Sequence, residues 1–256
     1  MTTQISSLEE YQKIYAESVD NPEQFWKTQG ETFTWQKPFE KTLEWNFDEP
    51  NVKWYLNGKL NITENCLDRH IAERGDQVAI LWEPNDPNSA VQKYTYKELL
   101  RAVSKCANGL KSRGIKKGDR VVFYMPMVPE LAIGVLACAR IGAIHSVVFA
   151  GFSAQALADR VDDAKAKMII CSDFNNRGNK NIPVKQVVDN AMDISCNSIE
   201  TVLVHKNTGG DINWSADVDI WWHDALDGQL EICAPEMMDS EDMLFILYTS
   251  GSTGKP

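Results

Sequence analysis

Short apolar runs alternate with amphipathic segments along most of this chain. The strand-like runs are apolar almost throughout and cover residues 121–125, 145–150, 167–171 and 201–205. Between and before them lie helical patterns at residues 99–110, 130–142, 154–164 and 184–192. A strand that is buried on both faces is continuously apolar, and helical crossovers make successive strands parallel. The sequence therefore predicts an α/β fold, in which a parallel-rich sheet is layered with helices.

Local signals place the ends of several of these elements. Thr95 and Glu98 have the spacing of a capping box, and Gly114 can end the helix that follows. Pro129 and Pro183 can each open a helix, and Ser153 can cap one. Three further elements are expected nearby: a hairpin-like strand pair at 77–83 and 91–96, an amphipathic helix at 64–74, and a short segment packed on the sheet at 219–228.

The first 60 residues differ from the rest of the chain. They carry four of its eight tryptophans and little periodic apolar pattern. Residues 7–30 predict one or two short helices with a break at Asn21–Pro22. An irregular arm is expected to follow. Spaced tryptophans on a polar arm typically anchor it to a larger body by burying their rings.

The charge balance excludes several classes of partner. The chain has 26 Lys and Arg against 36 Asp and Glu, a net charge of −10, which argues against binding to nucleic acid or to an anionic membrane. No apolar run reaches the ~18 residues of a membrane-spanning helix. The N-terminus has no secretory signal, so a cytoplasmic location is expected. The six cysteines lack metal-site spacing and the four histidines are dispersed, which indicates buried, reduced thiols and no protein-held metal.

The last fourteen residues carry the most informative motif. Residues 243–248 form an apolar strand pattern that runs directly into Thr249-Ser250-Gly251-Ser252-Thr253-Gly254-Lys255-Pro256. The glycines allow backbone N–H groups to form an anion-binding nest, the hydroxyls add donors, and the lysine adds a positive charge. The glycine spacing and the final proline do not fit a Walker A loop. The segment therefore suits a polyphosphate, the alternative being a flexible surface turn.

This motif resembles the phosphate-binding signature of the adenylate-forming superfamily of acyl-CoA synthetases, luciferases and peptide-synthetase adenylation domains. Four further stretches are similar to the acetyl-CoA synthetase family: residues 22–26, 52–71, 115–153 and 175–185. The resemblance covers essentially the whole chain. It implies an N-terminal arm at residues 1–66, and at 67–256 the first part of an AMP-binding domain, an incomplete acyl-CoA-synthetase-like subdomain.

The resemblance implies a two-step reaction. Acetate attacks the α-phosphate of ATP to give acetyl-AMP and pyrophosphate, and the thiol of coenzyme A then displaces AMP to give acetyl-CoA. By this resemblance Thr249, Ser250, Gly251, Ser252, Thr253, Gly254 and Lys255 hold the β- and γ-phosphates, with Mg²⁺ bound to the nucleotide. The acetate pocket, the Mg²⁺ ligands and a mobile C-terminal domain with a catalytic lysine would follow residue 256. No catalytic residue is expected within the chain.

A coenzyme A site is also implied by the resemblance. It consists of Phe149, Gly151, Arg177, Gly178, Asn179, Lys180 and Ile182, with Ile182 against the adenine. Ala150 stands where the family commonly has glycine, and Lys180 where it often has a second arginine, so a bidentate contact is lost. From the residues alone, 177–180 is either a basic ligand loop at the carboxyl end of a strand or a solvated surface loop.

These features predict an N-terminal fragment of an acetate–CoA ligase that is inactive alone. Its partners would be acetate, ATP, coenzyme A and the missing C-terminal part of its own chain, with no nucleic acid and no membrane. Two alternatives stay open. The enzyme could be a propionate- or acetoacetate-specific relative, because acyl choice depends on residues beyond Pro256. The chain could also be a non-catalytic module that senses coenzyme A or ATP.

Overall fold

The computed structural model describes residues 5–249, and the described residues form two compact units. The arm unit comprises the chain up to Asn65 together with Met237–Asp242. The sheet unit comprises Cys66–Glu236 and the chain from Met243 onward. Each unit has its own secondary structure.

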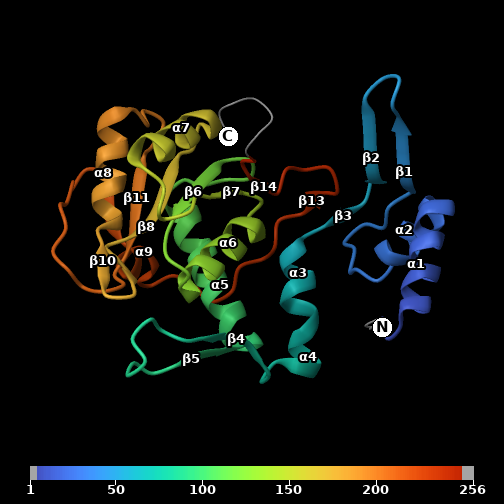
Figure 1. Cartoon of the computed structure of the whole chain (residues 1–256), viewed down its shortest axis with the longest axis horizontal. Coiled ribbons are helices and arrows are strands. Elements are labelled where there is room, and N and C mark those ends of the chain that lie inside the picture. The colour runs from blue at the N-terminus through green and yellow to red at the C-terminus, as the bar shows by residue number, and fades with distance from the viewer. Residues whose placement is uncertain (1–4, 250–256) are drawn as a thin grey trace. The chain divides into compact units, whose positions relative to one another are not determined.

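A six-stranded sheet organises the sheet unit (Figure 1). Its strands are β6 (Arg120–Tyr124), β7 (Ile144–Val147), β8 (Met168–Ser172), β11 (Thr201–His205), β12 (Asp219–Trp221) and β14 (Phe245–Ile246). They lie in the order β12-β11-β8-β6-β7-β14, and every neighbouring pair is parallel. The α/β fold with a parallel, helix-layered sheet is confirmed. The segment expected to pack against the sheet at 219–228 forms its edge strand β12 and then the short helix α9 (Trp222–Leu226), which packs on the sheet as predicted.

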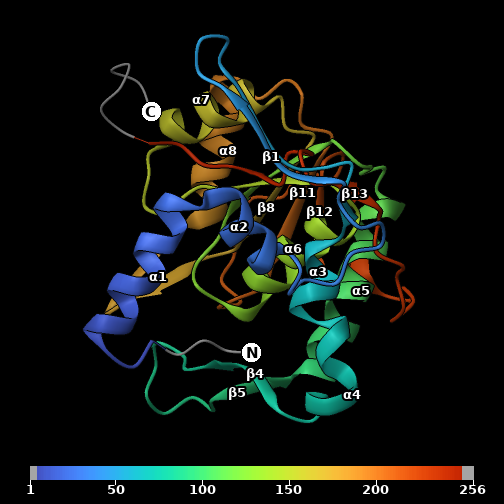
Figure 2. The same cartoon turned by 90° about the vertical axis from the view of Figure 1, so that its right-hand side faces the viewer.

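Helices cover both faces of this sheet (Figures 1 and 2). One face packs against α5 (Tyr96–Ser112), α6 (Pro129–Arg140) and α9 (Trp222–Leu226). The other face packs against α7 (Ala154–Ala164) and α8 (Val184–Ile194). All five residues of β8 are buried, as a strand covered on both sides must be.

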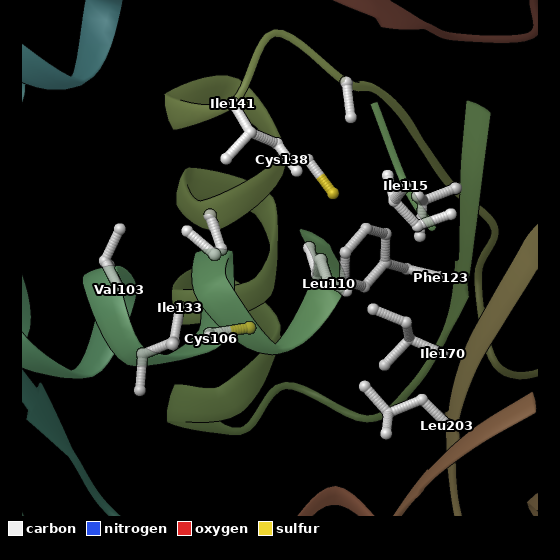
Figure 3. Close-up of a cluster of buried hydrophobic side chains, with 14 of the residues drawn as sticks. Val103, Cys106, Leu110, Ile115, Phe123, Ile133, Cys138, Ile141, Ile170 and Leu203 are labelled. Atoms are coloured by element: carbon white, nitrogen blue, oxygen red, sulfur yellow. The ribbon is translucent and has the colours of Figure 1, made fainter. Parts of the chain in front are cut away.

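The core between the sheet and α5 and α6 depends on one close approach. The Phe123 ring extends from β6 toward Leu110 and Cys138 on the two helices (Figure 3). A Cβ atom on Gly134 of α6 would lie 2.5 Å from Cε1 of Phe123. A side chain at this position would therefore force either the Phe123 ring or the helix to shift within a packed core.

The capping box predicted at the start of α5 is confirmed. The Thr95 backbone N–H donates to Glu98 Oε2 over 2.8 Å, and the Glu98 N–H donates to Thr95 Oγ1 over 3.2 Å. Thr95→Ala is expected to lower the free energy of unfolding by ~1 kcal/mol, because the Glu98 N–H in the first turn loses its side-chain acceptor. Chemical denaturation checks this, with Thr95→Ser as the control that retains the cap. Equal losses for both variants would contradict it.

The expected hairpin is present and the expected helix at 64–74 is not. Strands β4 (Val78–Trp82) and β5 (Gln92–Thr95) pair antiparallel, as predicted. The predicted single helix is wrong, because the segment forms three short pieces, α3 (Ile62–Cys66), η1 (Asp68–His70) and α4 (Ile71–Arg74). Leu67 is non-helical, and the Arg140 guanidinium binds both carboxylate oxygens of Asp68 at 2.9 and 3.0 Å. These contacts override the helical periodicity.

The arm unit contains more regular structure than its sequence indicates. The two helices α1 (Leu8–Asp20) and α2 (Pro22–Gly30) are separated at Asn21, as predicted. The expected irregular arm is wrong, because β1 (Lys41–Asn46) and β2 (Asn51–Leu56) form an antiparallel hairpin and β3 (Lys59–Leu60) pairs with β13 (Met238–Asp239). Most side chains of β1 and β2 are exposed or half-buried, so no buried face gives a period-two apolar pattern.

Aromatic rings hold the arm unit together. Trp35, Phe39 and Tyr55 form a cluster with ring centroids 5.0–5.5 Å apart, and Trp26 meets Trp54 at 5.9 Å. These ring contacts lie within the arm unit itself. Trp26 stays 41% exposed, so its ring is only partly buried by them.

The cysteines are mostly buried, but not all. Cys106, Cys138, Cys171, Cys196 and Cys233 are buried, whereas Cys66 is exposed, so a buried thiol is the wrong expectation there. Cys66 sits at the end of the short α3, where the predicted continuous apolar helix face does not form. No helix of residues 5–249 is both long enough and apolar enough to cross a membrane.

Candidate functional site

Three of the predicted ligand-binding segments follow strands at the same edge of the sheet. Residues 149–153 follow β7, residues 175–182 follow β8, and Thr249 follows β14. Because all six strands are parallel, their carboxyl ends meet at one edge, where ligands of open α/β sheets bind. The fold therefore brings Thr249, with which the predicted phosphate segment begins, and the predicted coenzyme A segments to one side of the sheet unit.

Most of the predicted phosphate segment lies outside the described residues. This holds for Ser250, Gly251, Ser252, Thr253, Gly254 and Lys255. Thr249 is described, is exposed, and belongs to no helix or strand. The structure therefore gives the root of the segment but not the arrangement of its glycines, its other hydroxyls and its lysine.

The strand that leads into this segment is shorter and more exposed than predicted. Only Phe245 and Ile246 pair with β7, opposite His145 and Ser146. Only these two residues of the segment predicted at 243–248 form a strand, and Phe245 is 51% and Leu247 67% exposed. These side chains are exposed because β14 is an edge strand, the last in the sheet order of the described chain. An apolar run does not distinguish an inner strand from an edge strand.

Residues 149–153 form a tight turn. The Gly151 and Phe152 N–H groups both donate to Phe149 O, over 2.7 and 3.0 Å. The Tyr124 hydroxyl donates to Phe152 O over 2.7 Å, and Ser153 Oγ then caps α7. Phe149 remains 63% exposed at the tip. The turn is thus held from the sheet and presents an aromatic face that could stack on a planar ligand.

The predicted basic loop is a β-hairpin. Strand β9 (Asn175–Arg177) pairs antiparallel with β10 (Lys180–Ile182), and the two-residue turn between them has Gly178 at φ +57. This positive φ at the first turn position is typical of a type II′ turn, which glycine favours. The expectation of a loop is wrong, because Gly178 and Asn179 form a two-residue turn that lets the flanking residues pair as strands. Most of these residues are polar, so the sequence shows no strand pattern.

The register of this hairpin places two cations together. Lys180 is the direct cross-strand partner of Arg177, so both side chains lie on the same face, and both are exposed. Like charges opposite each other destabilise a hairpin. The arrangement therefore favours an anion between them. Ile182, at the other end of β10, is half-buried opposite Asn175.

Asn85 holds the tip of the hairpin, and the sequence pattern gives no signal for it. Asn85 Nδ2 donates to Gly178 O and the Gly178 N–H donates to Asn85 Oδ1, both over 3.3 Å. Asn85 belongs to the turn between β4 and β5, 93 positions earlier in the chain. Between that turn and the hairpin lies an open cavity of about 670 Å³, whose lining includes Trp82, Asn85 and Asn175.

Removal of the Asn85 amide is expected to loosen the hairpin tip. Asn85→Ala should speed exchange of the Gly178 amide hydrogen by about fivefold, since a hydrogen bond contributes roughly 1 kcal/mol. Hydrogen exchange followed by NMR measures this. Asn88→Ala is the matched control, because Asn88 lies in the same turn and, among residues 5–249, its hydrogen bonds are to Asp86. An unchanged Gly178 exchange rate in Asn85→Ala would contradict the clamp, by which we mean the two hydrogen bonds between Asn85 and Gly178.

Two family models match this chain. The model described as "AMP-binding enzyme" matches residues 67–256, and that described as "Acetyl-coenzyme A synthetase N-terminus" matches residues 11–66. These matches confirm the predicted resemblance to the acetyl-CoA synthetases of the adenylate-forming superfamily.

Individual relatives agree with the family models. The acetyl-coenzyme A synthetase of Shewanella frigidimarina is 49% identical over 253 residues, covering 97% of this chain and 38% of the relative. That of Penicillium chrysogenum is 50% identical over 255 residues, covering 99% and 38%. Among solved structures, acetoacetyl-CoA synthetase from Streptomyces lividans superposes with a TM-score of 0.86 over 96% of this chain and 37% of that one, at 24% identity, which shows the fold alone. The chain spans a little over a third of the length of these relatives and belongs to the AMP-binding enzyme family.

Proposed function

We propose that this chain is the N-terminal part of an acetate–CoA ligase. The complete enzyme would convert ATP, acetate and coenzyme A into acetyl-CoA, AMP and pyrophosphate through acetyl-adenylate. The observation that carries the proposal is identity of 49–50% over nearly the whole chain with relatives named acetyl-coenzyme A synthetase, including the N-terminal arm. A cytoplasmic location stays a prediction.

In this proposal the phosphates of ATP bind at residues 249–255. Backbone N–H groups at Gly251 and Gly254, four hydroxyls and the Lys255 ammonium would neutralise the tail of the nucleotide while its α-phosphate is attacked. Adenylyl transfer of this kind depends mainly on positioning and on stabilising developing negative charge. Mg²⁺ would come bound to the nucleotide. Within residues 5–249 no three His, Cys, Asp or Glu side chains converge as metal ligands, so no residue is assigned to it.

Coenzyme A would bind at the turn and at the hairpin. Phe149 and Gly151 would contact it from the turn, and Arg177, Gly178, Asn179, Lys180 and Ile182 from the hairpin. The paired cations of the hairpin supply charge for its phosphates. Lys180 provides a point charge rather than a bidentate fork, so we expect most of the directional contact to come from Arg177.

The acetate pocket and the groups that act on the reacting atoms are assigned to the part of the protein that follows. We therefore expect the product of the full gene to catalyse acetate-dependent exchange of pyrophosphate into ATP, and purified 1–256 not to do so. No exchange by the full-length product would contradict the ligase. Faster exchange with propionate or acetoacetate would point to an enzyme with that specificity, and binding of coenzyme A or ATP without exchange would favour a non-catalytic module.

A further inference from the structure

Arg160 on α7 is a buried cation held between two aromatic rings. The residue as a whole is only 6% exposed. The guanidinium carbon lies 4.9 Å from the centroid of the Phe152 ring and 5.1 Å from that of the Tyr248 ring. Both distances are within the range of a cation–π contact.

The two rings belong to different segments of the candidate site. Phe152 is part of the turn that follows β7, next to Gly151. Tyr248 immediately precedes Thr249, the first residue of the predicted phosphate segment. One side chain of α7 therefore contacts both the turn assigned to coenzyme A and the root of the segment assigned to ATP.

Hydrogen bonds fix each part of this arrangement. Arg160 Nη1 donates to Ala156 O over 2.7 Å, which anchors the guanidinium to its own helix. The Tyr248 hydroxyl donates to Asp163 Oδ2 over 2.7 Å and lies 3.3 Å from Arg160 O. Burial and the bond to Asp163 raise the pKa of Tyr248, so this hydroxyl stays protonated and keeps donating. Arg160 and Asp163 are three positions apart and share one face of the helix.

Stability alone is a poor reason for this arginine. Within residues 5–249 its guanidinium forms no ion pair with a carboxylate at 4.0 Å or less. A buried charge is costly to desolvate, and an apolar residue of similar volume often stabilises a fold as well or better. This desolvation cost is explained if the Arg160 guanidinium is needed to hold the Phe152 and Tyr248 rings in position.

We propose that Arg160 is a positioning residue that fixes the coenzyme A turn and the root of the ATP phosphate segment relative to each other. The inference rests on the proposed function, because the two segments are assigned to their ligands there. In this proposal Arg160 acts on both substrates through the two rings. Its replacement should therefore weaken the use of both substrates at once.

The test uses the full-length product of the gene. Arg160→Met is expected to raise KM for ATP in acetate-dependent pyrophosphate exchange and KM for coenzyme A in acetyl-CoA formation, each about tenfold. Arg160→Lys, which keeps a cation between the rings, should recover both values to within about threefold of the wild type. If Arg160→Met does not fold, Arg160→Gln removes the charge with a polar side chain and carries the same expectation.

Arg120→Met is the matched control. Arg120 grips the other end of α7, where its Nε donates to Ala164 O over 2.6 Å and its Nη2 to Lys165 O over 3.1 Å. It contacts neither of the two segments through these bonds, so both KM values should stay unchanged. Unchanged KM values in the Arg160 variants, or equal shifts in Arg120→Met, would overturn the proposal.

A readout that does not depend on activity separates the two proposals. Amide hydrogen exchange of the peptide that includes Tyr248 should be faster in Arg160→Met than in the wild type and in Arg120→Met. A wild-type protein without acetate-dependent exchange of pyrophosphate would contradict the ligase, whereas unaltered amide exchange in Arg160→Met would contradict the positioning role.

Discussion

Replacement of Lys185 by methionine is expected to lower the free energy of unfolding of the sheet unit by about 3–5 kcal/mol. Lys185 is the second residue of α8 and is 1% exposed. Its ammonium pairs with Asp189 and lies 2.9 Å from Asp219 Oδ2 on β12, whose side chain is also 1% exposed. Removal of the cation leaves the Asp219 carboxylate buried without a counter-charge. Native-state hydrogen exchange of the β8 and β11 amides measures the loss.

A surface pair of the same unit provides the control. Lys97 lies 3.0 Å from Asp76, and both side chains are well exposed. Lys97→Met should change stability by no more than ~0.5 kcal/mol, because exposed ion pairs are weak. Adding Asp219→Asn to Lys185→Met should restore part of the stability by removing the unpaired charge. A loss below ~1 kcal/mol in Lys185→Met would show that water reaches this cluster and solvates the carboxylates.

Replacement of both hairpin cations is expected to raise KM for coenzyme A by about 100-fold in the full-length protein. A charge-assisted hydrogen bond contributes roughly 1.5–3 kcal/mol, and exposure at the hairpin reduces this to about tenfold for each of Arg177 and Lys180. The double variant Arg177→Gln, Lys180→Gln should leave KM for ATP unchanged. Steady-state formation of acetyl-CoA at two ionic strengths checks this, and the variant should depend less on salt than the wild type.

Lys206→Gln is the control for this experiment. Lys206 follows β11 at the same edge of the sheet, is exposed, and lies outside the hairpin. Its replacement removes one charge from that edge without touching the predicted site. Lys180→Arg should instead lower KM for coenzyme A, because it adds a bidentate fork. An unchanged KM for coenzyme A in the double variant would place the coenzyme elsewhere.

The parts of the fold that the sequence predicts are those that local chemistry decides. Inner strands such as β8 are apolar on both faces, and this signal does not depend on distant residues. The capping box of Thr95 and Glu98 is likewise complete within one turn of helix. Both were predictable because the residues that decide them are neighbours in the sequence.

The parts that the sequence does not predict depend on distant partners or on solvent. The helix expected at 64–74 is broken where Asp68 meets Arg140, 72 positions away. The hairpin of β1 and β2 escapes detection because its exposed faces carry no apolar alternation. In the candidate site the residue types at the turn and hairpin were visible, but the clamp of Asn85 and the grip of Arg160 were not, since each joins segments that only the fold brings together.

Arg177 and Lys180 lie opposite each other in the hairpin, so closure of the hairpin and binding of an anion are coupled. Without a ligand the two cations repel each other, which favours an open hairpin tip. A phosphate bound between them attracts both cations and favours the closed tip. Because the two equilibria are linked, a change that favours the closed hairpin raises the affinity for the anion. Binding of the anion shifts the closure equilibrium by the same factor. Simple oxyanions such as sulfate should therefore compete with the coenzyme and order the hairpin at the same time.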